Sequence, residues 1–495
     1  MRKQQLIKRN LLTLSCILLS SLVSAKSIKT VKSLYEFSNP VDVTRIDYSK
    51  NATTVYFATN TDSAKVRISR HIYVVADDGK EYHAKSIKGI QFDSLYSATD
   101  KGLKFSVDFE PVNETNIALD VRNPGQFSIY GIHDANTPLV VPKVETAINP
   151  DEEKPEFYQG KDVEIEGVVN YENVKWIVCN YITPRPQEGE KETYRTIIDA
   201  DGHFKLRFKT YEPRRLTLSL SSEIFKDVYI RPGDKLFVEF NNRNEGKEFS
   251  YKNMSGHQTY TKLVNAPGSL FFDFNSYIND VANKFADKSY GQLRTELMDA
   301  YATSLERTNY INWHYCLSPY EAKMNIDEIN AWYILYMISA DVRVKWEYLN
   351  ATTEENRKKY GDLLNKMDYS YLKNLSPNDA TSFSNNLLTS VANDMIKQLY
   401  PIENCFQRVP EGTPHRWLKV IELQQEELNK ITGWKGKTLI MEMIIIGDIH
   451  YLSKIDGEED YEEVRKMMSH PLTQEYFDIY YKSYKDYVEG RTTGI

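Results

Sequence analysis

The stretch GLKFSVDFEPV, Gly102–Val112, decides the first part of the fold. Its residues alternate in polarity: Leu103, Phe105, Val107 and Phe109 are apolar, whereas Lys104, Ser106 and Asp108 are polar. Because the side chains of a strand point alternately to its two faces, this period of two predicts a half-buried β-strand.

Similar patterns surround this stretch. Thr54–Ala58 and Phe127–Ile132 also predict strands, and Asp77-Asp78-Gly79 predicts the turn of a β-hairpin. We therefore expect an N-terminal sandwich-like β domain over residues 26–148. Residues 149–161 are acidic and contain two prolines, which predicts a linker.

A second β domain is predicted over residues 162–255. Tyr194–Ile198 and Phe204–Phe208 flank Asp199-Ala200-Asp201-Gly202, which predicts another hairpin. Pro232-Gly233-Asp234 predicts a tight turn, because proline presets φ and glycine accepts a positive φ.

The period of the apolar residues changes near residue 256, and the remainder, 256–495, is predicted to be helical. Leu293, Leu297, Tyr301 and Leu305 recur every four residues, and Gly433 follows a helical pattern that it is suited to end. The fold class is therefore predicted as α+β and multidomain, with two antiparallel, sandwich-like β domains followed by an α-helical domain.

The N-terminus predicts export. Residues 1–25 combine four basic residues with the apolar stretch Leu11–Val23 and a small residue, Ala25, which indicates a cleaved signal peptide. Its removal changes the net charge from −7 to −11, which disfavours a nucleic-acid partner. The apolar segments Ala331–Ala340 and Leu439–Ile446 are too short to span a bilayer, so no transmembrane span is expected in the mature chain. We expect a periplasmic or cell-envelope protein.

The sequence contains no recognisable catalytic motif, and we predict no catalytic residue, cofactor or metal. His450, beside Asp448, is interpreted as a packed or capping histidine. His314 and Cys316 are too few to define a zinc site. The acidic run Asp456–Glu463 is interpreted as a solvated loop and helix start.

Aromatic residues are abundant, with 35 tyrosines in the chain. Around Trp332 and Trp346 they fall at helical spacing on an apolar segment, which favours a core position. A second group near the C-terminus lies on a more polar helix and comprises Tyr480, Tyr481, Tyr484 and Tyr487. These four are the candidate binding residues, and both packing within the chain and docking of a partner stay open for them.

Several stretches carry a resemblance to a known family. They are VVADDGKEYHAKSIKGIQFD (Val74–Asp93) with GLKFSVDFEPV (Gly102–Val112), VYIRPGDKLFVEF (Val228–Phe240), MDYSYLKNLSPNDATSF (Met367–Phe383) and SHPLTQEYFDIYYKSYKDYVEGRTTGI (Ser469–Ile495). They resemble the N-terminal region of the thioredoxin-like, TlpA-type disulfide reductases exported by Gram-negative bacteria. In larger members of that family a β region and a helical region precede a C-terminal thioredoxin domain.

The chemistry that the resemblance implies is missing from this sequence. The family uses a Cys-x-x-Cys motif, whereas Cys179, Cys316 and Cys405 lie far apart, and any disulfide among them stays open. The resemblance therefore implies either a truncated relative or a non-catalytic binding and scaffold protein. Its partner would be another envelope protein or a separate thioredoxin-like protein. The alternative is a glycan-binding or glycan-processing envelope protein, suggested by the sandwich-like domains and abundant aromatics.

Overall fold

The structure is a computed structural model that describes most of the chain. The described residues are 26–37, 39–150, 154, 156, 159–182, 191–221, 225–241, 249–256, 289–379, 391, 396–436, 438–448 and 458–491. The predicted signal peptide, His450 and part of the predicted linker lie outside them. The chain divides into two compact units: the first comprises residues up to 142 together with 313–316, and the second comprises the rest.

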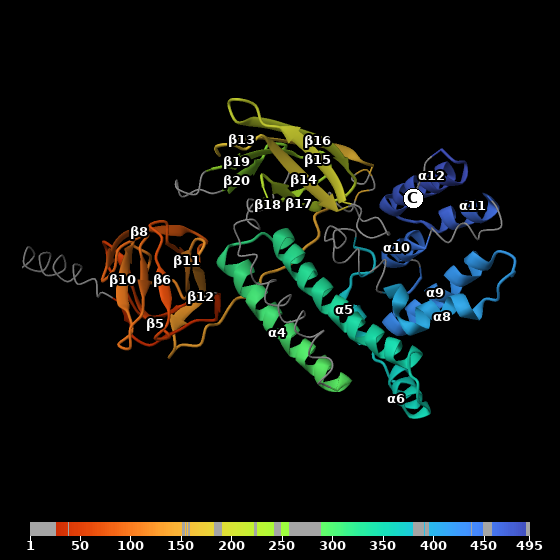
Figure 1. Cartoon of the computed structure of the whole chain (residues 1–495), viewed down its shortest axis with the longest axis horizontal. Coiled ribbons are helices and arrows are strands. Elements are labelled where there is room, and N and C mark those ends of the chain that lie inside the picture. Colours follow the sequence, from red (N-terminus) through yellow and green to blue (C-terminus); the bar gives the residue numbers. More distant parts are fainter. Residues whose placement is uncertain are drawn as a thin grey trace, which may run out of the picture. The chain divides into compact units, whose positions relative to one another are not determined.

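The first unit is a β domain. Its strands are β1 (Ser27–Ile28), β2 (Val31–Lys32), β3 (Tyr35–Phe37), β4 (Val41–Tyr48), β5 (Thr53–Thr59), β6 (Lys65–Arg67), β7 (Tyr73–Ala76), β8 (Glu81–Lys88), β9 (Leu95–Ser97), β10 (Lys104–Phe109), β11 (Leu119–Asn123) and β12 (Phe127–Asp134). The main sheet has the order β1-β4-β5-β10-β8-β7-β11-β12-β2, with β3 also paired to β12 and β6 paired to β9. Figure 1 shows these strands, in red to orange, wrapped around a common core.

The stretch Gly102–Val112 contains β10, which lies in the middle of this sheet. It pairs antiparallel with β5 on one side and with β8 on the other. Phe105, Val107 and Phe109 are buried, as the alternation predicts. The predicted hairpin around Gly79 is confirmed, because β7 and β8 pair antiparallel across that turn.

Residues 313–316 complete the first unit with a buried polar network. The Tyr315 hydroxyl donates to Asp120 at 2.9 Å and accepts from Arg122 at 3.1 Å. The Nε2 atom of His314 lies 3.2 Å from the Val75 carbonyl oxygen. His314 is therefore part of a buried hydrogen-bond network inside a β domain, which is a structural role.

The second unit begins with a β-sandwich. Its strands are β13 (Lys161–Val169), β14 (Trp176–Ile182), β15 (Lys191–Ile197), β16 (His203–Thr210), β17 (Arg214–Ser219), β18 (Phe225–Ile230), β19 (Lys235–Phe240) and β20 (Phe249–Asn253). They form two four-stranded sheets, β16-β13-β19-β20 and β15-β14-β17-β18, whose inner residues share one core. All pairs are antiparallel except β13 with β19, which is parallel.

Gly167 permits that parallel pair, because a Cβ there would lie 2.1 Å from the Val238 carbonyl oxygen. The hairpin predicted around Gly202 is wrong, since β15 and β16 belong to opposite sheets. Their aromatic residues meet across the core instead, where the rings of Tyr194 and Phe208 stack with centroids 4.7 Å apart.

Helices make up the rest of the second unit. They are α4 (Tyr290–His314), which ends in the first unit, α5 (Pro319–Leu349), α6 (Glu354–Leu364), η4 (Ser370–Asn374), η7 (Ile396–Gln398), α8 (Tyr400–Arg408), α9 (Arg416–Thr432), α10 (Leu439–Gly447), α11 (Glu458–Met467) and α12 (Pro471–Val488). Every residue of α10 is buried. Gly433 caps α9 with a φ of 73°, as its position predicts.

Buried polar contacts join the sandwich to the helices within this unit. Glu212, which precedes β17, accepts hydrogen bonds from Arg214 and from Tyr476 of α12, and all three side chains are buried. Arg215 of β17 forms an ion pair with Glu328 of α5 at 3.1 Å.

The predicted fold class is confirmed, since β-rich domains precede a helical region. Among the described residues, no helix is long and apolar enough to cross a membrane.

Candidate functional site

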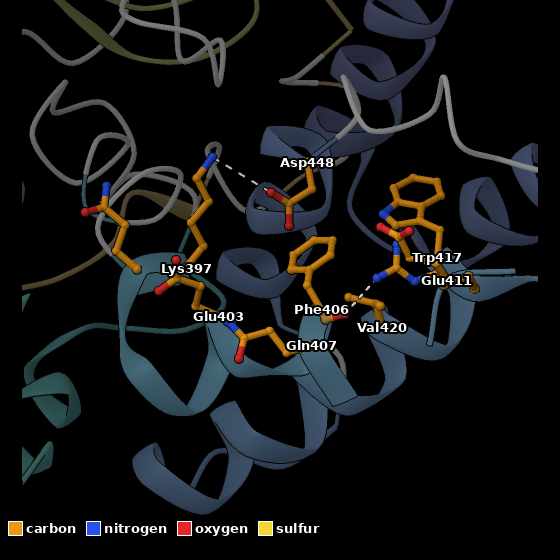
Figure 2. A pocket seen from close by; sticks show the side chains of 10 residues that line it. Lys397, Glu403, Phe406, Gln407, Glu411, Trp417, Val420 and Asp448 are labelled. Atoms are coloured by element: carbon orange, nitrogen blue, oxygen red, sulfur yellow. Dashed lines mark hydrogen bonds and ion pairs between the residues drawn. The ribbon is translucent and has the colours of Figure 1, made fainter. Parts of the chain in front are cut away.

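A pocket opens in the second unit where η7, α8, α9 and the end of α10 meet (Figure 2). Its volume is about 390 Å³, within the range of small-molecule sites. The described residues that line it are Lys397, Gln398, Glu403, Phe406, Gln407, Glu411, Arg416, Trp417, Val420 and Asp448.

The junction between α8 and α9 shapes one side of the pocket. Arg416, the first residue of α9, donates to the carbonyl oxygens of Phe406 at 2.8 Å and Val409 at 2.9 Å. These bonds satisfy carbonyl groups at the C-terminal end of α8 that the helix itself leaves unpaired. Arg416 therefore ties the two helices together and is committed to a structural role.

This junction builds an apolar wall from Phe406, Trp417 and Val420. Trp417 and Val420 are 5% and 1% exposed. The indole N–H of Trp417 is buried and has no acceptor among the described residues. A buried donor of this kind is costly to leave unpaired, so the wall combines apolar surface with a hydrogen-bonding group.

A charged group faces that wall from the end of α10. Asp448 caps α10, and its backbone N–H donates to the Ile444 and Ile445 carbonyl oxygens. Its carboxylate is 1% exposed and accepts a hydrogen bond from Gln424 Nε2 at 3.3 Å. The Lys397 ammonium lies 3.8 Å from Asp448 Oδ1, and Figure 2 shows the two side chains reaching toward each other.

Two further carboxylates belong to the pocket lining. Glu403 contacts the Lys345 ammonium, which also donates to the Gln398 carbonyl oxygen at 3.0 Å. Glu411 is exposed. The lining therefore contains cationic and anionic groups together, next to an apolar wall.

No model of a known protein family matches this chain, and no curated protein matches its sequence. The resemblance to the TlpA-type reductases thus stays a prediction.

The predicted tyrosines do not line this pocket. Tyr480, Tyr481 and Tyr484 pack against the helical core as partly buried side chains of α12. The ring of Tyr481 stacks on Tyr461 of α11, with centroids 3.5 Å apart. The side chain of Tyr487 lies outside the described residues. A docking role for these tyrosines stays a prediction.

None of the three described cysteines is among the residues that line the pocket, although Cys405 of α8 packs against Phe406 and Val420, which do line it. All three carry thiols rather than disulfides. Cys179 faces the sandwich core, where burial raises its pKa to about 12, and burial in α8 raises that of Cys405 to about 11. Cys316 belongs to the first unit.

The acidic run Asp456–Glu463 differs in part from the expectation. Helix α11 does start within it, at Glu458, but Asp460 is only 2% exposed. Its carboxylate contacts Nδ1 of His415, the residue that precedes α9 with a left-handed φ of 51°. The described residues contain no group of three or more metal-ligating side chains.

Sequence reasoning missed the pocket. Asp448 was noted only as the neighbour of His450, and Lys397 lies 51 positions before it. One signal was present: Asp448 is the first charged residue after the apolar stretch Met443–Ile446, where a buried helix has to end.

Proposed function

We propose that this chain is an exported, non-catalytic binding and scaffold module related to the N-terminal region of the TlpA-type reductases. The observation that carries the proposal is the composition of the pocket. Its described lining offers charged, amide and aromatic groups that can hold a ligand, but no serine, threonine, cysteine or histidine. It therefore lacks the hydroxyl, thiol and imidazole groups from which nucleophile–base pairs are usually built.

The thiols support the same proposal. Disulfide reductases need a thiolate with a lowered pKa beside a second cysteine. Here burial raises the pKa values of Cys179 and Cys405, which favours the inert thiol form. Both therefore suit a packing role.

The contacts within the second unit support a scaffold. A buried charged group costs free energy unless it is paired, so the contacts of Glu212 with Arg214 and Tyr476 strongly favour one arrangement of sandwich and helices.

The test is insulin reduction driven by dithiothreitol, with a Cys-x-x-Cys thioredoxin as the positive control. We expect the purified mature chain, from Lys26 onward, to leave the rate at that of dithiothreitol alone. A faster rate that Cys316→Ser abolishes would refute the proposal. Export is tested separately by fusing residues 1–30 to a phosphatase that is active only outside the cytoplasm.

A second candidate function, glycan binding, is favoured by one surface of the sandwich. Trp176 and Ile197 are cross-strand partners on the outer face of β14 and β15, and they are 44% and 77% exposed. The Arg195 guanidinium lies 3.8 Å from the Trp176 ring centroid. An exposed indole beside polar groups is suited to stack on a sugar ring. A glycan array would support this candidate only through hits that Trp176→Ala removes.

Glycan processing has less support from the pocket. Glycoside hydrolysis needs one protonated and one ionised carboxyl group. Glu403 and Asp448 each lie next to a lysine and form an ion pair with it, so neither is placed as a separate proton donor.

A further inference from the structure

We propose that Arg122, on the outer face of the main sheet of the first unit, binds the carboxylate of a hexuronic acid, the acidic sugar of many polysaccharides. The inference rests on the proposed binding function and names a class of ligand for it. It is carried by a row of four side chains on neighbouring strands, namely His83, Tyr73, Arg122 and Ser128.

The register of the sheet sets this row. Tyr73 of β7 is the Cα partner of His83 on β8 and of Arg122 on β11. Arg122 is in turn paired with Ser128 of β12. Side chains of paired residues lie on the same face of a sheet, and the adjacent Val121 points to the other face, into the core. His83 is exposed and the other three are half-buried, so the row is open to solvent.

Arg122 offers one edge of its guanidinium group to a ligand. Its Nη1 atom donates to the Tyr315 hydroxyl at 3.1 Å, and the group lies 5.5 Å from the Tyr130 ring centroid. Within the part of the chain that the structure describes, its Nε and Nη2 atoms form no hydrogen bond or ion pair. Neither is among the buried atoms that lack a partner, so both reach solvent. Two parallel N–H groups of this kind match the two oxygens of a carboxylate.

Other arginines of the chain show how the same edge is used when a carboxylate is present. Arg45, also in the first unit, contacts both oxygens of Asp47 through Nε and Nη2. Arg465 of α11 binds Asp478 in the same way, at 2.7 and 2.8 Å. Arg45 is exposed, whereas Arg122 is half-buried, where an unpaired charge costs more free energy. A carboxylate from a ligand would complete the pairing at Arg122.

Asp120 does not take that place. It lies two positions before Arg122 on β11 and is fully buried. One of its oxygens accepts from the Gly131 backbone N–H at 2.8 Å, and the other accepts from the Tyr315 hydroxyl at 2.9 Å. The Tyr315 hydroxyl thus links Asp120 to the Nη1 side of Arg122. The edge formed by Nε and Nη2 is left for an external anion.

The rest of the row suits a sugar ring. A hexuronic acid carries its carboxylate directly on the pyranose ring, so pairing with Arg122 brings the C–H groups of that ring next to the aromatic ring of Tyr73. The imidazole of His83 lies 5.8 Å from the Tyr73 ring, and its Nε2 atom lies 3.9 Å from the Glu81 carboxylate. Together with the Ser128 hydroxyl, these groups offer donors and acceptors to sugar hydroxyls.

The test uses isothermal titration calorimetry on the mature chain with four probes. D-glucuronate carries the ring and the charge, its methyl ester lacks the charge, acetate lacks the ring, and inorganic phosphate is an anion of different shape. We expect D-glucuronate to bind at least about ten-fold more tightly than each of the other three, because only it supplies both the charge-assisted hydrogen bonds and the ring contact.

Variants locate the binding. Arg122→Lys keeps the charge but loses the bidentate edge, so it should weaken D-glucuronate binding about ten-fold. The matched control Arg45→Lys should leave the affinity unchanged, because Asp47 already occupies that edge. Trp176→Ala, on the sandwich, should also leave it unchanged. Circular dichroism checks that each variant is folded, and the probe series decides the question even if one variant is not.

Three results would overturn the inference. They are a comparison probe that binds as tightly as D-glucuronate, unchanged affinity in Arg122→Lys, and no binding of D-glucuronate at millimolar concentration. Each would refute this site alone, because the binding-module function is judged separately by insulin reduction.

Discussion

Replacing Asp341 with asparagine should change how the stability of this protein depends on pH. Asp341 lies in α5 and is 2% exposed. Its carboxylate accepts hydrogen bonds from the hydroxyls of Tyr290 and Tyr371, and Arg294 of α4 lies 3.3 Å away. The side chain thus joins α4, α5 and η4.

The structure sets the direction and size of the effect. Burial, more than any neighbour, raises the pKa of Asp341 from 3.8 to about 6. The folded protein therefore binds this proton more tightly than the unfolded chain does. As pH rises from 3.8 through 6, ionisation of Asp341 costs the folded state ~3 kcal/mol, at 1.36 kcal/mol per pKa unit. Asp341→Asn does not ionise and avoids this loss.

The hydrogen-bonding partners of Asp341 also contribute to the stability difference between Asp341→Asn and wild type. Arg294 also donates to the Asp368 carbonyl oxygen and the Tyr290 hydroxyl, each at 2.7 Å, and these two bonds do not involve the Asp341 carboxylate. The cost of losing interactions that the protonated carboxyl group also makes is the same at all pH values, whereas pairing of the ionised carboxylate with Arg294 is already contained in the pKa of Asp341. The predicted quantity is the change with pH in the stability difference between variant and wild type.

Urea unfolding, monitored by tryptophan fluorescence, measures this change in the stability difference. Five of the six tryptophans lie between residues 313 and 434, so the signal reports on the helical region. The stability of Asp341→Asn relative to wild type should rise by ~2–3 kcal/mol between pH 4 and pH 7. The control Asp299→Asn removes an exposed carboxylate from α4 and should show a much smaller change. A flat difference for Asp341→Asn, or one that falls with pH, would show that pairing with Arg294 outweighs burial.

Three further predictions concern stability and thiol reactivity. Glu442→Gln should destabilise the protein by ~2 kcal/mol in urea unfolding, because the buried carboxylate accepts backbone N–H groups at the start of α12. Gly167→Ala should cost ~3 kcal/mol or more by the same assay, since its Cβ would overlap a carbonyl of the parallel neighbour strand. Ellman's reagent should modify exposed Cys316 in the folded protein but Cys179 and Cys405 only after unfolding; rapid modification of a second thiol would contradict the burial of both.

Patterns within single segments were predictable from the sequence. The alternation in Gly102–Val112 became the central strand β10, and the turn at Gly79 joined paired strands. Gly433 ended α9 in the left-handed conformation. These features depend on residues a few positions apart, whose side-chain period and backbone freedom are local properties.

The partners of those segments were less predictable. Sequence neighbours β15 and β16 were expected to pair edge to edge, but they lie in opposite sheets and meet through Tyr194 and Phe208. The turn itself is where it was expected, with Gly202 at a φ of 83°. A turn sequence specifies a reversal of direction, whereas the core decides which sheet the next strand joins.

The sequence by itself determined the order of β and helical regions, the turn at Gly79 and the end of α9. Only the tertiary structure decided that Asp448 and Lys397 face each other beside Trp417, and that Asp341 and Asp460 are buried within a chain rich in exposed acids. The physical reason is that burial and pairing of a charge depend on the segments packed over it. Those segments come from distant parts of the chain, so no local period records them.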